Sequence, residues 1–210
     1  MLSHNTLAHH ALTRRNATVR PWLLVLAGTV LMTLCARISF HLPWNPLVPI
    51  TMQTFGALLI GALYGPRLGA ATIAAYILEA MLGLPVLAGG TSAWAASTIP
   101  GLPVAFGPTA GYLYAMPAAA ALVGWLATRS WDRKVATALG AMLLGTMVIL
   151  VAGFAWLLVA MSIIKGGAPN MQALFSAAVL PFIPGDLIKV ALAALALPGG
   201  WALLGSKAGR

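Results

Sequence analysis

The sequence predicts an all-α integral membrane protein with six transmembrane helices and with both termini in the cytoplasm. Its composition excludes a soluble domain, because 60% of the 210 residues are hydrophobic and only 7% are charged, against roughly a quarter charged in soluble domains. The apolar residues gather in six runs, and a bilayer crossing needs ~20 such residues. Basic residues gather in alternate connections between the runs. We therefore expect one membrane domain.

The first 20 residues are polar and contain two basic clusters. They lack the apolar core and the small-residue cleavage site of a signal peptide. We expect residues 1–20 to be a cytoplasmic tail and residues 21–210 to be the membrane domain. His4, His9 and His10 have no cysteine or acidic neighbour in the tail, so we predict no metal site there. We also expect the protein to need no cofactor.

Helix-breaking residues separate the apolar runs that follow. Val48-Pro49 opens the second run, Gly83-Leu84-Pro85 ends the third, and Gly107-Pro108 opens the fourth. Basic residues stand before the third run, at Arg67, and between the fourth and fifth. The predicted spans are 22–40, 48–64, 68–84, 108–128, 135–164 and 180–204.

The twelve Lys and Arg residues fix the orientation of these spans. With a cytoplasmic N-terminus, only Arg37 and Lys165 lie outside and Lys189 lies in the membrane. Nine basic residues then lie inside: Arg14, Arg15, Arg20, Arg67, Arg129, Arg133, Lys134, Lys207 and Arg210. This distribution obeys the positive-inside rule. The net charge of +9 is therefore a topology signal and does not indicate a nucleic-acid site.

Polar side chains from four spans share one depth in the outer half of the membrane. Asp186 and Lys189 lie three residues apart in the last span, and Gln53, Glu79 and Tyr112 lie at similar depth in spans two to four. Ionisable groups in hydrocarbon are costly and usually mark substrate or ion pathways. We therefore predict a binding site that opens to the outside.

The connection at residues 86–107 is long, uncharged and rich in Gly, Ser, Thr and Pro. It is predicted to fold over the site as a lid, where Trp94 could stack on a ring. Structural roles compete with each of these assignments. Asp186 and Lys189 could simply neutralise each other, Glu79 could bond a neighbouring helix, and Trp94 could belong to an interfacial aromatic belt. Gln53 and Tyr112 could join helices.

Four sequence blocks together resemble the BioY family, which is the biotin-binding S component of energy-coupling factor (ECF) transporters. The blocks occur in the order of the family and cover most of residues 45–193. They read NPLVPITMQTFGALLIGALYGPRLGA (45–70), YILEAMLGLPVLAGG (76–90), GPTAGYLYAMP (107–117) and PFIPGDLIKVALA (181–193).

The resemblance implies a six-helix S-component fold in the bacterial inner membrane that captures biotin from outside. It implies membership of a complex with a transmembrane T component and two cytoplasmic ATPases. It also implies that Asp186 binds the ureido N–H groups of biotin and that Lys189 serves the same pocket. Glu79 lies in a stretch from which the family supplies another polar contact, and Gln53, Tyr112 and Trp94 complete the expected wall and lid.

In S components, small residues on the first helix dock the T component. The nearest small-residue spacings here pair Thr29 with Thr33 and Gly28 with Ala36, so these four residues are the expected docking face.

Three other classes of function compete with this assignment. An S component for thiamin or riboflavin would share the architecture. An intramembrane enzyme would need a nucleophile with a base or a set of metal ligands, and the sequence has neither GxSxG nor HExxH. A structural subunit would not need an acid and a base beneath a lid. No Walker A motif is present, so any ATPase is expected to be a separate chain.

Overall fold

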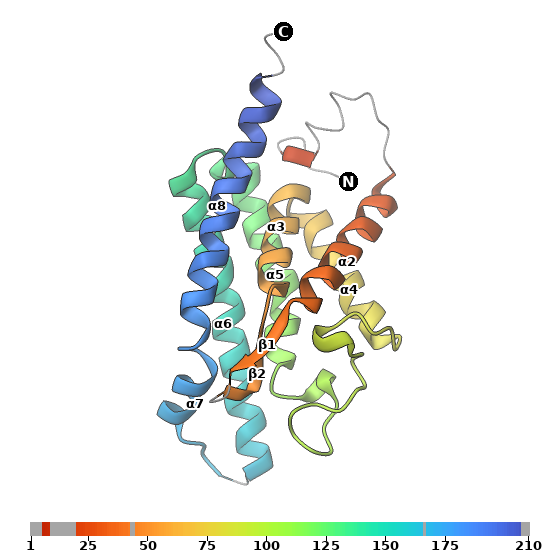
Figure 1. Cartoon of the computed structure of the whole chain (residues 1–210), viewed down its shortest axis with the longest axis vertical. Coiled ribbons are helices and arrows are strands. Elements are labelled where there is room, and N and C mark those ends of the chain that lie inside the picture. The colour runs from red at the N-terminus through yellow and green to blue at the C-terminus, as the bar shows by residue number, and fades with distance from the viewer. Residues whose placement is uncertain (1–5, 9–19, 43–44, 166, 207–210) are drawn as a thin grey trace.

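The described part of the chain contains the seven α-helices α2 to α8, three short 3-10 helices and one β-hairpin (Figure 1). The structure is a computed structural model that describes residues 6–8, 20–42, 45–165 and 167–206. Most of the predicted tail 1–20, including its three histidines, lies outside these residues. The elements are α2 Pro21–Arg37, β1 Ser39–Leu42, β2 Asn45–Thr51, α3 Gln53–Tyr64, α4 Pro66–Met81, α5 Ala110–Thr128, α6 Val135–Lys165, α7 Met171–Ala178 and α8 Phe182–Ser206.

Each predicted span overlaps one helix, but the first three spans were drawn beyond the helix ends, and the first two extend into a β-hairpin. Residues 39–42 and 45–51 form the antiparallel strands β1 and β2, with Ser39 opposite Thr51 and Phe40 opposite Ile50. Residues 48–51 are therefore not helical. Val48, Ile50 and Thr51 are β-branched, and Val48 and Ile50 are buried on alternate positions of the strand, a pattern that favours a strand over a helix.

Three helices are long and apolar enough to cross a membrane within the described residues. These segments are Ala110–Thr128, Val135–Ile164 and Phe182–Trp201, in α5, α6 and α8. The helices α2 and α3 are apolar but shorter. The count of six spans and the orientation of the termini therefore remain predictions.

Helix α5 lies at the centre of the bundle and packs against α3, α4 and α6, while α8 packs against α6. Small residues allow the helices to approach one another most closely. A side chain at Gly61 of α3 would collide with the backbone of Ala120 in α5. Ile60 and Ala120 are fully buried at this crossing. The stability of the bundle therefore depends on close helix packing of the kind that is common in membrane proteins.

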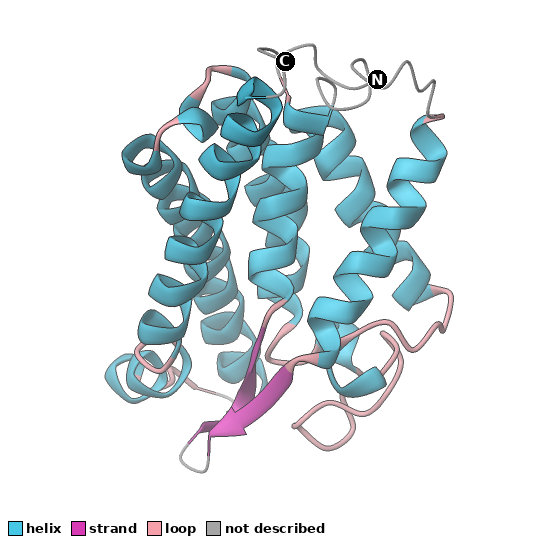
Figure 2. Cartoon of the chain, turned by 45° about the horizontal axis from the view of Figure 1, so that its top comes forward, coloured by secondary structure: helices cyan, strands magenta, loops and turns pink. Residues whose placement is uncertain are grey.

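The two ends of the bundle differ in structure (Figures 1 and 2). The hairpin lies at one end, together with residues 82–109, which we call the lid segment. The start of α2 and the end of α8 lie at the opposite end, where the short 3-10 helix Trp131–Arg133 contacts α8. Helices α3 and α8 both begin near the hairpin end, so their first turns lie at a common level.

The small residues expected to form the docking face are mainly used inside the chain. Gly28, Thr29 and Ala36 are buried, and a side chain at Gly28 would collide with Thr72 of α4. Thr33 is half-buried and donates a hydrogen bond to the Thr29 carbonyl at 2.9 Å. The lack of a side chain at Gly28 allows α4 to approach α2. The assignment of the four residues to a partner surface stays a prediction.

Candidate functional site

A cavity of about 180 Å³ lies at the hairpin end of the bundle. The hairpin and the lid segment form part of its wall, and α3, α5, α6 and α8 supply the rest. Most of its surface is apolar. Its polar lining residues are Thr51, Gln53, Thr54, Thr91, Ser97, Thr98, Thr109, Tyr112, Asp186 and Lys189.

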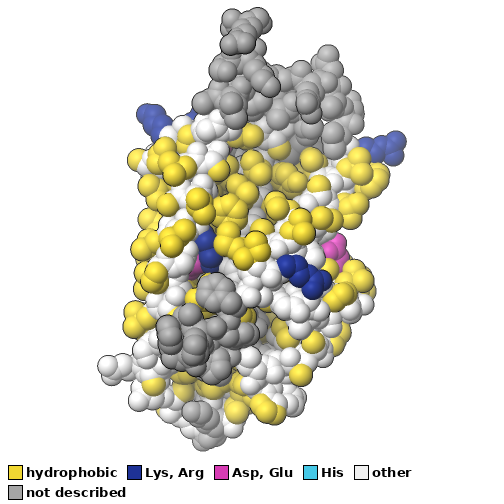
Figure 3. Space-filling view, in the orientation of Figure 1, with side chains coloured by type: hydrophobic (Ala, Val, Ile, Leu, Met, Phe, Trp, Pro, Cys, Tyr) yellow, Lys and Arg dark blue, Asp and Glu magenta, His cyan; other side chains and the backbone are white. Residues whose placement is uncertain are grey.

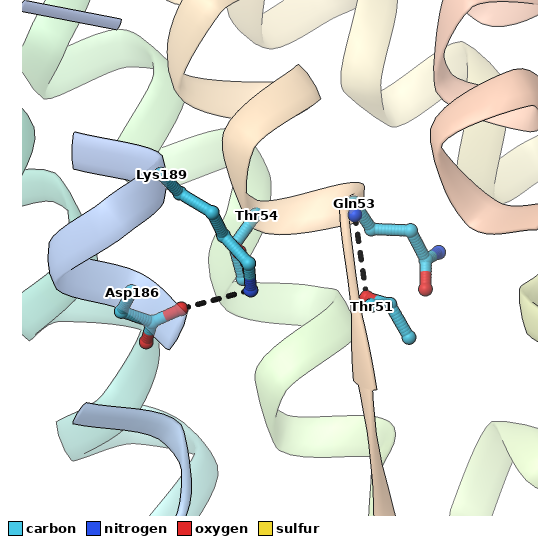
Figure 4. A network of polar contacts seen from close by, with 5 residues as sticks. All are labelled: Thr51, Gln53, Thr54, Asp186 and Lys189. Atoms are coloured by element: carbon cyan, nitrogen blue, oxygen red, sulfur yellow. Dashed lines mark hydrogen bonds and ion pairs between the residues drawn. The ribbon is translucent and has the colours of Figure 1, made fainter. Parts of the chain in front are cut away.

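Asp186 and Lys189 form an ion pair in the first turns of α8 (Figure 4). Lys189 Nζ lies 3.0 Å from Asp186 Oδ1. The Lys189 side chain is only 9% exposed, and the Asp186 side chain is only 7% exposed. Spacing of three residues places both on one side of the helix. Lys189 also donates to the Thr54 hydroxyl of α3 at 3.3 Å. The pair thus links α8 to α3 and presents charged groups to the cavity without a net charge.

Gln53 begins α3 and lies on a different side of the cavity from the ion pair. Its side chain points away from Asp186 and Lys189 (Figure 4), and its amide nitrogen donates to the Tyr76 hydroxyl at 2.8 Å. Tyr76 is fully buried in α4 and donates in turn to the Val86 carbonyl at 2.8 Å. This chain of bonds fixes the Gln53 amide and ties the lid segment to two helices.

Tyr112, in the first turn of α5, forms another part of the wall. Its hydroxyl donates to the Ala178 carbonyl at the end of α7, at 3.0 Å. Its ring stacks on Phe182, with centroids 6.2 Å apart and an interplanar angle of 28°. Gly153 of α6 lies directly against the ring, where any side chain would collide with it. The position of Tyr112 is therefore set by three helices.

Side chains of four helices hold the lid segment by its backbone carbonyls. Their donors lie on α2, α4, α5 and α6, and each bond is 2.8 or 2.9 Å long. The bonds run from Arg37 to Pro85, from Tyr76 to Val86, from Tyr114 to Ala105 and from Trp156 to Gly107. The lid segment is thus anchored near both of its ends.

The structure does not bring Glu79 or Trp94 to the cavity. On α4, Tyr76, Ile77 and Ala80 face the core, whereas Leu78 is exposed and Glu79 is half-buried at the boundary. Trp94 is 56% exposed, and its indole nitrogen donates to the Met81 carbonyl at 2.7 Å. The four other predicted residues, Gln53, Tyr112, Asp186 and Lys189, all line the cavity.

The sequence did not point to Tyr76, which bonds to Gln53 beside the cavity. It also did not identify the individual lid residues that line the cavity, such as Leu87, Thr91 and Ser97. Tyr76 stands three residues before Glu79 in an apolar helix, and this position could have marked it as a candidate. A buried tyrosine usually needs a hydrogen-bond partner, so its hydroxyl could have been considered together with Gln53.

Residues 8–206 match the model described as the BioY family. The chain belongs to the BioY family. This confirms the membership inferred from the four sequence blocks, and the match extends over nearly the whole chain.

A solved structure resembles this BioY protein with a TM-score of 0.65 and 26% sequence identity. The match covers 85% of this chain and 88% of the other, which is described as the S-component for biotin from an ECF-type ABC transporter. The fold of this BioY protein is thus similar to that of an S component. A search of curated protein sequences gave no match.

Proposed function

We propose that this BioY protein is the S component of an ECF-type transporter and that it captures biotin from the outer side of the membrane. The observation that carries the proposal is the cavity at the hairpin end, where a buried acid and base face a mostly apolar chamber beneath a lid. Membership of the BioY family and the likeness to a biotin S component support biotin as the ligand.

The chemistry of the cavity fits biotin group by group. The ureido ring offers two N–H donors, and the Asp186 carboxylate accepts such bonds. The thiophane ring is apolar and matches the lining around Leu87, Met116 and Phe182. Lys189 donates to the ureido carbonyl or to the valerate carboxylate, and the Gln53 amide and Tyr112 complete the wall. Binding requires no catalytic step and no cofactor, because biotin is the transported substrate.

The proposal includes a multi-pass arrangement in the bacterial inner membrane, with six spans and both termini inside. Basic side chains at the end opposite the hairpin support this orientation (Figure 3). Hydrophobic side chains cover much of the face between the two ends (Figure 3), as expected for contact with lipid. A T component and two cytoplasmic ATPases would supply the energy for uptake.

Calorimetry on the purified protein in detergent tests the ligand assignment. We expect sub-micromolar binding of biotin and no binding of thiamin or riboflavin. Binding of another vitamin in place of biotin would overturn the ligand while leaving the S-component fold intact. Absence of any vitamin binding by folded protein would favour a structural role for the ion pair.

A further inference from the structure

The Tyr76 hydroxyl, which does not line the cavity, fixes the orientation of the Gln53 side-chain amide. This hydroxyl has one proton and lies 2.8 Å from the Val86 carbonyl oxygen, which can only accept a hydrogen bond. Tyr76 therefore donates to Val86 and can only accept from Gln53, whose Nε2 atom lies 2.8 Å away. In the flipped amide, the oxygen would face the lone pairs of the hydroxyl. The two bonds thus select the orientation with Nε2 towards Tyr76.

This orientation leaves the amide oxygen of Gln53 available to a ligand. Among the described residues, the Gln53 side chain bonds only to Tyr76, through Nε2. The Oε1 atom is not enclosed by protein either, because the enclosed side-chain atom that lacks a partner in the described part of the chain is Asp132 Oδ1. Gln53 is 6% exposed and lines the cavity. Its accessible Oε1 atom is therefore an unused acceptor at the cavity.

We propose that Gln53 Oε1 accepts a hydrogen bond from one ureido N–H group of biotin and that Tyr76 is the positioning residue for this contact. The inference rests on the proposed function. Biotin with an ionised carboxylate has no donors besides its two ureido N–H groups, so an acceptor in the cavity can serve only one of these.

The placement of the two acceptors fits the shape of the ureido ring. Its N–H groups point to different sides of the ring, and the Gln53 side chain and Asp186 lie on different sides of the cavity (Figure 4). Asp186 then accepts from the second N–H group. Because Tyr76 also donates to Val86 in the lid segment, one hydroxyl holds both the amide that contacts the ligand and the start of the lid.

Calorimetry with biotin on Tyr76→Phe and on Tyr114→Phe tests the role of Tyr76. Each substitution removes a hydroxyl that donates to a lid carbonyl, at 2.8 Å to Val86 and at 2.9 Å to Ala105. Neither tyrosine lines the cavity, and of the two only Tyr76 bonds to Gln53. We expect Tyr76→Phe to weaken binding about three- to tenfold, which corresponds to one net hydrogen bond, and Tyr114→Phe to weaken it less than about twofold. Equal weakening in both variants would make Tyr76 a lid anchor only and would overturn the inference.

A double-mutant cycle separates positioning of the amide from packing of the ring. Gln53→Met keeps the length of the side chain and removes both of its polar atoms. If Tyr76 acts through Gln53, Tyr76→Phe should cause no further loss of affinity in the Gln53→Met protein. The same loss in both backgrounds would contradict a positioning role for Tyr76.

A crystal structure of the wild-type protein with biotin needs no variant, so it decides the question even if Tyr76→Phe does not fold. We expect Gln53 Oε1 to lie about 2.7–3.2 Å from one ureido nitrogen, with both bonds of the Tyr76 hydroxyl retained. Bound biotin whose ureido nitrogens both bond elsewhere would overturn the inference and leave the proposed function intact. Failure of the wild type to bind biotin would overturn the proposed function, and the inference with it.

Discussion

Asp186 and Glu79 are both carboxylic acids but occupy different surroundings. Asp186 faces the cavity in an ion pair, whereas Glu79 lies at the boundary of α4 outside it. We expect Asp186→Asn to weaken biotin binding at least tenfold, because it removes a charge-assisted acceptor worth roughly 1.5–3 kcal/mol. Glu79→Gln, the same change of charge, should alter the affinity less than about twofold. Calorimetry on both variants measures the difference.

A large loss of affinity in Glu79→Gln would show that α4 reaches the ligand after all, in agreement with the expectation from sequence. The melting temperature of each variant serves as the control for folding. Asp186→Asn should retain a cooperative unfolding transition, since the asparagine can still accept a hydrogen bond from Lys189.

The sequence could predict a cavity residue only where the depth of the side chain in the membrane was enough to place it. Chain direction placed Gln53, Tyr112, Asp186 and Lys189 at one level, and all four line the cavity. Depth along a helix does not say which face a side chain occupies. For that reason the sequence could not separate Tyr76, which bonds to Gln53 beside the cavity, from Glu79, one turn further along the same helix.

At the scale of elements, the hydropathy of the sequence did not reveal the hairpin. The strand β2 and the helix α3 are both apolar, and a short apolar segment does not distinguish strand from helix. Pro46 and Pro49 in β2 were available as evidence against an early helix start. The eight-residue helix α7 was not predicted either, because it falls in a connection between two longer apolar runs.

A contact at the opposite end joins the α5–α6 connection to α8. The Trp201 indole nitrogen donates to Asp132 Oδ2 at 2.6 Å, and the Arg133 guanidinium lies 4.6 Å from the Trp201 ring centroid. Asp132 is 2% exposed, and its Oδ1 atom has no hydrogen-bond partner among the described residues. Burial raises the pKa of the Asp132 carboxyl above its ordinary value of 3.8, and the bond from Trp201 only partly opposes this.

The direction of this pKa shift sets a pH dependence of stability. Below pH 3.8 the carboxyl is protonated in both folded and unfolded protein, so it contributes no difference. As the pH rises through the raised pKa, the folded protein must hold a buried charge and loses stability. Asp132→Asn keeps an acceptor for Trp201, so it should melt at a higher temperature than wild type near neutral pH and at the same temperature in strong acid. Equal melting temperatures at all pH values would contradict the shift.

At the scale of the whole molecule, the orientation in the membrane can be tested by labelling. Trp94 and Trp131 lie in connections at opposite ends of the bundle. In a Cys35→Ala background, which removes the single native cysteine, we expect Trp94→Cys to react with an impermeant maleimide added to intact cells. Trp131→Cys should react only after the cells are lysed. The reverse pattern would place the cavity on the cytoplasmic side and exclude capture from outside.

Composition and charge were sufficient to predict a helical membrane bundle, but they do not show how each crossing is completed. Helix α3 has 12 residues and rises about 18 Å at 1.5 Å per residue. A hydrocarbon core is about 30 Å thick. The strand β2 continues the chain beyond the N-terminal end of α3. The shape of the hairpin end therefore depends on packing between a hairpin and helices, which no single apolar run encodes.

The anchoring of the lid segment has a consequence for how this family can diverge. The bonds from Arg37, Tyr76, Tyr114 and Trp156 all end on main-chain carbonyls, which every amino acid provides. Side chains in the lid segment can therefore change over evolution without releasing it, whereas the four donors cannot be exchanged freely. The side chains at the mouth of the cavity, and with them the ligand preference, can therefore change while the backbone of the lid segment stays in place.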